Sequence, residues 1–319
     1  KQKQKNVSNR HILFLFCLLQ KEKVWYDTIR KKWNEQEVLL MRLGGSIMRP
    51  YHSPEEWLKE VKNLTYSTVI FPVDSFAPLH VQDEYAQCCR ENDLVIGEVG
   101  VWKNVLSADE NEKRRAIDYA KAQLHMAERV GANCCVNIVG SLSPTLWDGY
   151  APGNYAKETY DEIIRITREI IDDVNPKTSS YSLEPMPWMV PDSPEQYLQL
   201  IRDIDRPGFS VHLDFANMIN GVYRYHDAEN FIRHCFRLLG SRIRSIHLKD
   251  VKLGDDLPCC IREVMVGQGV LPLHIALEEA EKLGENTTVF TEHYDTHEDY
   301  VQATSYVRRL AKEHNINIK

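Results

Sequence analysis

Residues 180–214 read SYSLEPMPWMVPDSPEQYLQLIRDIDRPGFSVHLD, and this stretch holds one complete unit of strand, helix and strand. A short apolar run at each end finishes on a carboxylate, Glu184 in the first run and Asp214 in the second. Between them, Ser193 is followed by Pro194 and, three residues after the serine, by Gln196, which is typical of a helix start. Two apolar strands joined by a helix predict neighbouring strands of a parallel sheet.

The same unit recurs along the chain from Met41 onward. The predicted strands are Leu43 to Ser46, Thr68 to Val73, Leu94 to Val99, Cys134 to Val139, Ser180 to Glu184, Ser210 to Asp214, Ile243 to Leu248, and Val289 to Glu292. Helical periodicity predicts helices that start at Ser53 and Ser193 and others at Leu79 to Asn92, Asp109 to Val130, Asn154 to Val174, Asp227 to Leu239, Leu273 to Leu283, and Asp299 to His314.

Eight alternations in a chain of this length predict an α/β fold of the (β/α)₈ type, a TIM barrel in a single domain over residues 41–319. A doubly wound open sheet is the rival fold, but no glycine-rich phosphate turn follows the first strand. Residues 1–40 carry nine Lys/Arg against four Asp/Glu and differ from the acidic remainder. We interpret them as an atypical N-terminal extension outside the barrel.

Composition restricts the partners. The formal net charge of -7 argues against a nucleic-acid partner, which would need a concentrated Lys/Arg surface. The apolar run from Ile12 to Leu19 is far shorter than the ~20 residues that a membrane helix needs. Eight cysteines without CxxC spacing indicate thiols of a reducing compartment, so we expect a cytoplasmic protein with small polar substrates. The sequence leaves open whether it forms a homo-oligomer.

Four strands in the second half of the chain each end on a good metal ligand. These are Glu184, Asp214, His247 and Glu292. Carboxyl ends of barrel strands meet at one rim, so the four side chains should converge. Three carboxylates and one imidazole form an oxygen-rich set that favours Mn²⁺, with Mg²⁺, Co²⁺ or Zn²⁺ as other candidates. A single acidic residue after an apolar run is more often a solvated loop residue, but chance does not explain four in succession.

Such a site suits chemistry beside a sugar carbonyl. A divalent ion polarises a carbonyl or hydroxyl, the neighbouring C–H becomes more acidic, and a carboxylate can remove the proton to give an enediolate. Glu184 and Glu292 are the natural acid and base. A dehydratase or other lyase would use the same enediolate to expel a leaving group, and a non-catalytic sugar-binding barrel is a third alternative.

Further side chains are candidates for substrate binding. Glu98 and Trp102 lie near the end of the third predicted strand, where a carboxylate could hold hydroxyls and an aromatic ring could stack on a sugar. Lys249 shares a strand face with His247 and could contact substrate oxygens or a phosphate. Arg262, between the seventh strand and its helix, could bind a carboxylate or phosphate with both arms.

The segments Leu-Glu-Pro, His-Leu-Asp-Phe-Ala-Asn-Met, Ile-His-Leu-Lys-Asp and Thr-Glu-His, in this order, resemble the sugar phosphate isomerase/epimerase family of the xylose isomerase-like TIM barrels. The resemblance covers the chain from about Met41. It implies that the four ligands bind a metal ion and that Glu184 and Glu292 move the proton. The family includes ketose 3-epimerases, hydroxypyruvate isomerases and inosose dehydratases.

Two positions depart from the ketose 3-epimerase pattern. Asn217 stands where those enzymes place a histidine, and Leu253 stands where they place an arginine. The expected substrate is therefore a keto sugar, sugar acid or polyol derivative, with Asn217 as a further candidate for substrate contact. Endonuclease IV, a more distant relative with three zinc ions, takes histidines from early strands, whereas strands two and three end here without one.

Overall fold

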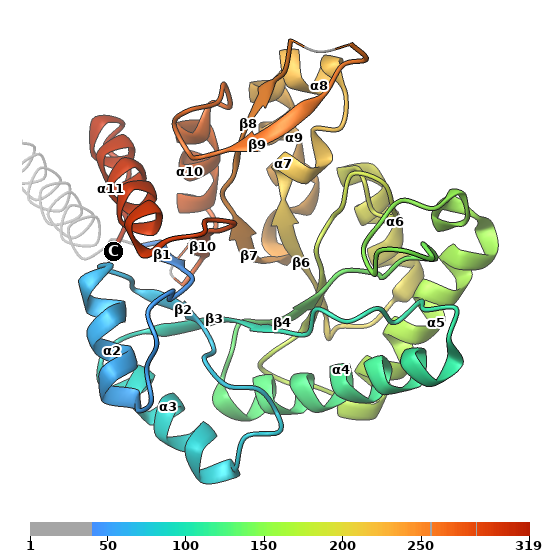
Figure 1. Cartoon of the computed structure of the whole chain (residues 1–319), viewed down its shortest axis with the longest axis horizontal. Helices are drawn as coiled ribbons and strands as arrows, with labels where there is room; N and C mark the ends of the chain where they lie inside the picture. Colours follow the sequence, from blue (N-terminus) through green and yellow to red (C-terminus); the bar gives the residue numbers. More distant parts are fainter. Residues whose placement is uncertain (1–39, 256, 285) are drawn as a thin grey trace, which may run out of the picture. The chain divides into compact units, whose positions relative to one another are not determined.

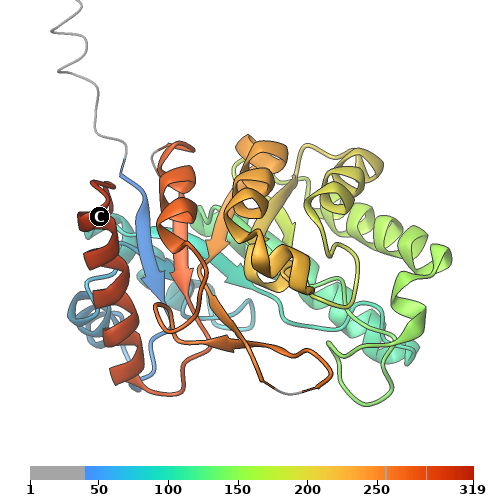
Figure 2. The same cartoon turned by 90° about the horizontal axis from the view of Figure 1, so that it is seen from above.

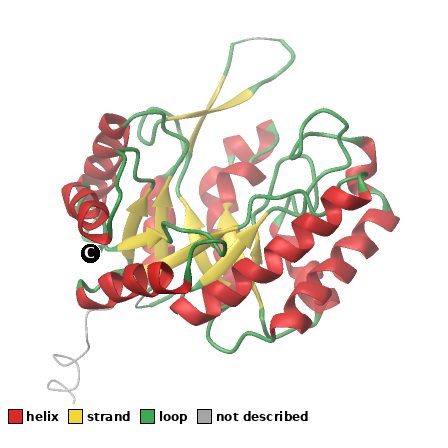
Figure 3. Ribbon diagram, turned by 60° about the horizontal axis from the view of Figure 1, so that its bottom comes forward, coloured by secondary structure: helices red, strands yellow, loops and turns green. Residues whose placement is uncertain are grey.

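Eight parallel strands form a nearly closed barrel with helices on its outside (Figure 1, Figure 3). The structure is a computed structural model that describes residues 40–255, 257–284 and 286–319. Apart from Leu40, the predicted N-terminal extension lies outside the described residues. Within those ranges no helix is both long and apolar enough to cross a membrane. The predicted (β/α)₈ barrel is confirmed.

The barrel strands lie close to their predicted positions. They are β1 (Arg42–Gly45), β2 (Thr68–Ile70), β3 (Val95–Gly100), β4 (Cys134–Asn137), β5 (Tyr181–Leu183), β6 (Phe209–Asp214), β7 (Ile243–His247) and β10 (Thr288–Thr291). Hydrogen-bonded ladders join them in the order β1-β10-β7-β6-β5-β4-β3-β2. The Ser67 N–H donates to the Leu43 carbonyl at 2.9 Å, so the two ends of this order lie beside each other and the barrel is nearly closed.

Helices follow the strands and cover the barrel. They are α2 (Pro54–Asn63), α3 (Leu79–Glu91), α4 (Glu110–Val130), α5 (Lys157–Val174), α6 (Pro194–Ile204), α9 (Ala228–Leu239), α10 (Leu273–Glu281) and α11 (His297–Glu313), with the 3₁₀ turns η1 (Pro152–Tyr155) and η2 (Gly240–Arg242). The serine starts predicted from the sequence are confirmed, because the hydroxyls of Ser53 and Ser193 accept from the N–H groups of Glu56 and Gln196.

Three additions to the regular barrel lie on the carboxyl side of β6 and β7. The short helices α7 (Phe215–Met218) and α8 (Val222–His226) follow β6. After β7, the strands β8 (Asp250–Leu253) and β9 (Ile261–Val264) pair antiparallel as a hairpin that projects from the barrel (Figure 1, Figure 2). No helix or strand was predicted in these segments, so the sequence missed all three.

Asp250 shapes the chain after the hairpin. Its Oδ2 accepts from the N–H groups of Gly267 and Gly269, each at 3.0 Å, and its Oδ1 accepts from those of Val251 and Leu271. Gly267 has a φ of +87°, which is strained for residues with a side chain. The Gly267 to Gly269 turn therefore wraps around one buried carboxylate.

Candidate metal centre

The four predicted ligands converge at the carboxyl ends of neighbouring strands. Asp214 and His247 are the last residues of β6 and β7, while Glu184 and Glu292 directly follow β5 and β10. One donor atom from each residue lies within 4.8 Å of the donors of the other three. Glu184, Asp214 and His247 are buried, and the Glu292 side chain is 13% exposed. The cluster can hold a divalent metal ion.

Strand register explains this convergence. Asp214 on β6 pairs directly with His247 on β7, and His247 pairs with Phe290 on β10, two residues before Glu292. Asp214 also caps the short helix that follows, because its Oδ1 accepts from the Asn217 N–H at 2.9 Å. The ligands are thus held by the sheet rather than by long loops, which keeps their spacing fixed.

Lys249 lies among the carboxylates. Its Nζ is 2.6 Å from Asp214 Oδ2, 2.6 Å from Glu292 Oε1 and 3.6 Å from Glu184 Oε1. Burial lowers the pKa of Lys249, but the three carboxylates outweigh burial and hold it well above its usual value. The ammonium therefore stays charged. Its predicted contact with substrate is untested, and its place at the centre of the cluster was not predicted.

The acids of the cluster differ in their pKa. Burial raises the pKa of Glu184, but the opposing effect of His247 and Lys249 is larger and lowers the pKa to about 2. Burial also raises the pKa of Glu292, but His247 and Lys249 outweigh burial and hold this pKa well below its usual value. At Asp214 burial dominates and raises the pKa to about 6. Glu184 and Glu292 are therefore both ionised near neutral pH and can act as bases.

Two acceptors in the cluster test whether a metal would fit. Asp214 Oδ2 and Glu292 Oε1 are buried and have no hydrogen-bond partner among the described residues, although both lie in ion-pair range of Lys249. The ammonium of Lys249 lies near both oxygens but is not aligned for a hydrogen bond with either of them. Buried carboxylate oxygens that attract a cation without directional bonds are suitable metal ligands.

Beneath the ligands, Glu98 holds His247 from the opposite side. His247 Nδ1 faces Glu292 Oε1 at 2.7 Å, whereas its Nε2 faces Glu98 Oε2 at 3.4 Å. Ser245 donates a short hydrogen bond to the other Glu98 oxygen. The His212 ring lies edge-on to the His247 ring, with 4.0 Å between the ring centroids.

Burial lowers the pKa of His247, but Glu292, Glu98 and Glu184 outweigh burial and hold this pKa well above its usual value. A metal would therefore have to replace the proton on Nδ1, and the proton that stays on Nε2 beside Glu98 would orient the ring.

Glu98 therefore occupies a different place from the predicted one. It lies inside β3, only 1% exposed, and not at the rim beside an open pocket. Burial raises its pKa, but His247 and His212 more than offset this, so the pKa is lowered and Glu98 stays ionised. His212 Nδ1 lies 3.3 Å from Glu98 Oε1. Substrate contact by Glu98 remains a prediction, and its described contacts are with the histidines and Ser245.

Asn217 joins the cluster. Its Nδ2 donates to Glu184 Oε1 at 3.2 Å and to the Pro185 carbonyl at 3.1 Å, and its Oδ1 accepts from Lys249 Nζ at 3.5 Å. The amide thus fixes the side chain of Glu184 and the position of Lys249. Its predicted contact with substrate stays a prediction.

Trp102 and Arg262 lie farther out. Trp102 follows the end of β3 with a φ of +49° and a side chain that is 36% exposed. Arg262 is an exposed residue of β9, paired in register with Lys252 on the projecting hairpin. Their predicted contacts with substrate are untested, and the structure does not bring them into the ligand cluster.

His293 is a neighbour of the site that the sequence did not single out. It has a φ of +63°, its Nδ1 lies 3.0 Å from Glu263 Oε2 on β9, and its Nε2 lies 3.7 Å from Glu292 Oε1. The hydrogen bond to Glu263 raises the pKa of His293. His293 therefore links the hairpin to the rim. No spacing pattern in the sequence distinguishes it from an ordinary loop histidine.

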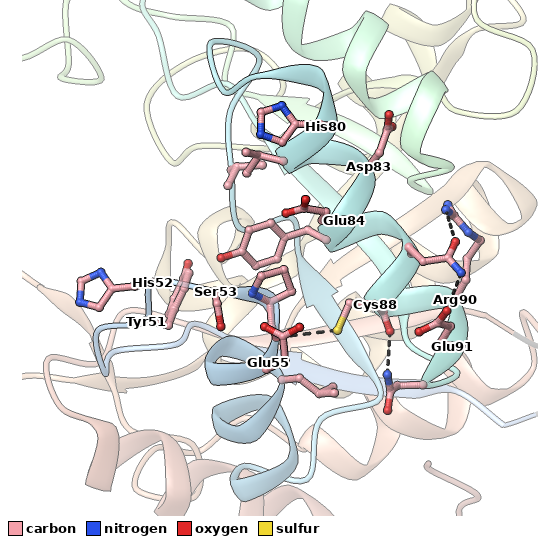
Figure 4. A pocket seen from close by; sticks show the side chains of 17 residues that line it. Tyr51, His52, Ser53, Glu55, His80, Asp83, Glu84, Cys88, Arg90 and Glu91 are labelled. Carbon is pink, nitrogen blue, oxygen red and sulfur yellow. Dashed lines mark hydrogen bonds between the residues drawn. The ribbon is translucent and has the colours of Figure 1, made fainter.

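A large groove lies elsewhere, between α2 and α3 (Figure 4). It has a volume of about 1100 Å³, and Tyr51, Glu55, Glu84 and Cys88 are among the residues that line it. None of the predicted site residues lines this groove. The converging ligands, rather than cavity size, therefore locate the candidate centre.

Comparisons with solved structures find the same architecture. The D-psicose 3-epimerase of Clostridium cellulolyticum H10, solved with D-tagatose, is 14% identical, with 85% of this chain and 99% of that chain covered and a TM-score of 0.62. A xylose isomerase-like TIM barrel protein of Mycobacterium smegmatis in complex with magnesium is 14% identical, with 86% and 97% covered and a TM-score of 0.62.

Endonuclease IV of Thermus thermophilus also matches, at 13% identity, with 85% of this chain and 99% of that chain covered and a TM-score of 0.65. At these identities the structures show a shared fold alone. No curated protein has a significant sequence match. The family model of the xylose isomerase-like TIM barrel matches residues 58–313, which is most of the chain. The chain therefore belongs to the xylose isomerase-like TIM barrel family.

Proposed function

We propose that the protein is a divalent-metal-dependent sugar isomerase or epimerase that works through an enediolate of a keto sugar, sugar acid or polyol derivative. The observation that carries this proposal is the convergence of Glu184, Asp214, His247 and Glu292, with donor atoms within 4.8 Å of one another. The fold shared with a D-psicose 3-epimerase and with a magnesium-bound barrel supports it.

The four residues of the cluster would hold the ion. Its oxygen-rich donor set favours Mn²⁺ over Mg²⁺, Co²⁺ or Zn²⁺. When bound, the ion would supply the polarisation that makes the C–H beside a substrate carbonyl or hydroxyl more acidic. Glu98 would keep His247 oriented, since its Oε2 lies 3.4 Å from His247 Nε2, on the far side from the carboxylates.

Glu184 and Glu292 are well placed to move the proton. In the order of strands, β10 and β5 stand at the two ends of the arc that supplies the ligands, with β7 and β6 between them. A substrate carbon above the centre would then have one carboxylate on each side. Both acids have a lowered pKa, so both are ionised and either one could accept the proton from a carbon that the bound ion has made acidic. The other carboxylate, once it has taken up a proton from solvent, returns that proton from the opposite side and inverts the carbon, while the first carboxylic acid loses its proton to solvent.

Solvent deuterium exchange tests the proposal. The protein would be loaded with Mn²⁺ and incubated in D₂O with keto sugars, sugar acids and inositol derivatives, and the products followed by NMR and mass spectrometry. The product of an epimerase or isomerase contains one deuterium from the solvent and otherwise has the mass of the substrate. A product that has lost water or an aglycone would favour the dehydratase or lyase alternative. Absence of exchange across the whole panel would favour a non-catalytic sugar-binding barrel.

Paired variants test the two proton carriers. Glu184→Gln and Glu292→Gln keep the side-chain shape but remove the base, so each should slow exchange by about 10²- to 10⁴-fold. Glu91→Gln is the matched control, because this carboxylate lies on the exposed surface of α3 and accepts a hydrogen bond from Gln87. Unchanged rates in both active-site variants would refute the assignment.

A further inference from the structure

Three potential metal ligands lie outside the barrel, away from the centre described above. His274 and Glu278 are four residues apart on α10, so they share one face of that helix. His314 is the residue that caps the end of α11, which packs beside α10. One donor atom from each of the three lies within 4.8 Å of the other two. The cluster therefore joins the last two helices of the barrel, which Figure 1 labels.

The two imidazole rings lie face to face, so one ring must turn before nitrogen atoms of both can point at the same ion. Their centroids are 4.2 Å apart and their planes differ by 19°, which is a stacked arrangement. The side chain of Glu278 is 34% exposed, and its Oε2 lies 3.7 Å from Arg233 Nη2, too far for a hydrogen bond. His274 is half-buried and His314 is exposed, so an ion could reach the three groups from solvent.

The donor set differs from that of the central cluster. Two imidazole nitrogens and one carboxylate oxygen suit Zn²⁺ and other late first-row metals, and a water molecule can complete a tetrahedral arrangement. The central cluster has three carboxylates and one imidazole and suits harder ions. The two places should therefore prefer different metals.

We propose that His274, Glu278 and His314 form a second metal site, selective for Zn²⁺-type ions, that fastens the end of α11 to α10. The segment after α11 is also part of the barrel closure. Ile318 bridges to Met41 beside β1, and the Ser67 hydroxyl donates to the Lys319 carbonyl. A metal at His314 would thus restrain the chain just before it docks against the first strand.

Metal titration tests the site in the full-length protein. The parent should bind two equivalents of Zn²⁺ by calorimetry, and His314→Ala and His274→Ala should each bind one. Binding of Mn²⁺ should be the same in all three proteins. His125→Ala is the matched control, because His125 is an exposed histidine on α4 that lies near a carboxylate, 3.9 Å from Asp173. This control should keep both equivalents.

A second background separates the site from the central one. In Asp214→Ala, one equivalent of Zn²⁺ should remain and should raise the melting temperature, and adding His314→Ala should remove both effects. Equal Zn²⁺ stoichiometry in the parent and His314→Ala would overturn the proposal. So would loss of an equivalent in the His125→Ala control. Neither result depends on whether the central cluster is catalytic.

Discussion

Replacing Lys249 by methionine tests whether its ammonium neutralises the buried carboxylates of the central cluster when no metal is bound. Methionine keeps an unbranched apolar chain but removes the ammonium that lies 2.6 Å from Asp214 Oδ2 and from Glu292 Oε1. Removing one partner of a buried ion pair costs about 3–5 kcal/mol, because the remaining charge stays buried and unpaired. Solvent screens this pair little, since the Lys249 side chain is 2% exposed.

Protonation relieves part of that penalty. Burial already raises the pKa of Asp214 to about 6 in the presence of the ammonium, so without it Asp214 takes up a proton more readily near neutral pH. The metal-free variant should therefore lose about 3 kcal/mol of its free energy of unfolding, the lower end of the range. Urea unfolding of the chelator-treated protein, followed by circular dichroism, measures this value.

A divalent ion should restore the variant more than the parent. In the parent the ion must share the carboxylates with Lys249, whereas in Lys249→Met it meets no competing cation. At 100 times its dissociation constant an ion stabilises a folded protein by about 2.7 kcal/mol, and each tenfold gain in affinity adds about 1.4 kcal/mol. We expect tighter Mn²⁺ binding by calorimetry and a smaller stability gap when Mn²⁺ saturates both proteins.

The control is Lys282→Met. This lysine is 61% exposed and pairs with Glu279 at 2.7 Å, so its loss should change stability by less than about 1 kcal/mol, with or without Mn²⁺. The reasoning is wrong if metal-free Lys249→Met is as stable as the parent. It is also wrong if the same deficit persists at saturating Mn²⁺, because the ammonium would then not occupy the place of the ion.

Two further substitutions address the supports of the site. Glu98→Gln removes the negative charge behind His247 Nε2 and should weaken Mn²⁺ binding by about 10- to 100-fold while the far-UV spectrum stays unchanged. Calorimetry measures the Mn²⁺ affinity, and an unchanged affinity would contradict the orienting role of Glu98. Asp250→Asn replaces an acceptor of the Gly267 and Gly269 N–H groups by an amide that can present a donor to them. The free energy of unfolding in urea should fall by about 1.5–3 kcal/mol. Equal stability would show that the turn after β9 forms without the carboxylate.

Much of the fold follows from local sequence patterns. Apolar runs placed all eight barrel strands, and the serine caps at Ser53 and Ser193 placed two helix starts. The hairpin was missed because β8 and β9 have only four residues each, and adjacent Arg262 and Glu263 are both exposed, without the expected alternation. The helices α7 and α8 are likewise too short, at four and five residues, to show helical periodicity.

The site was predictable where it depends on neighbouring strands and not where it depends on contacts across the barrel. The ends of parallel neighbours must meet, which places Asp214 beside His247. Glu98 on β3 reaches His247 on β7 through the interior, and such a contact depends on the stagger of the closed sheet. Strand alternation put Lys249 on the face of His247, but a flexible lysine chain could equally have pointed toward substrate.

The four predicted ligands lie at the strand ends, and the exposed tryptophans lie farther along the loops. All four ligands come from β5, β6, β7 and β10, and strand register fixes their spacing. Exposed tryptophans instead lie on loops after β3, β4 and β5, at Trp102, Trp147 and Trp188, with 36%, 39% and 38% of their surfaces exposed. The Trp188 indole donates to the Asp148 carbonyl at 2.7 Å, so two of these loops support each other. Glu184 directly follows β5 and Trp188 lies four residues later, whereas the loops after β3 and β4 carry none of the four predicted ligands. We therefore expect substitutions at Trp102 or Trp147 to leave the spacing of the ligands unchanged.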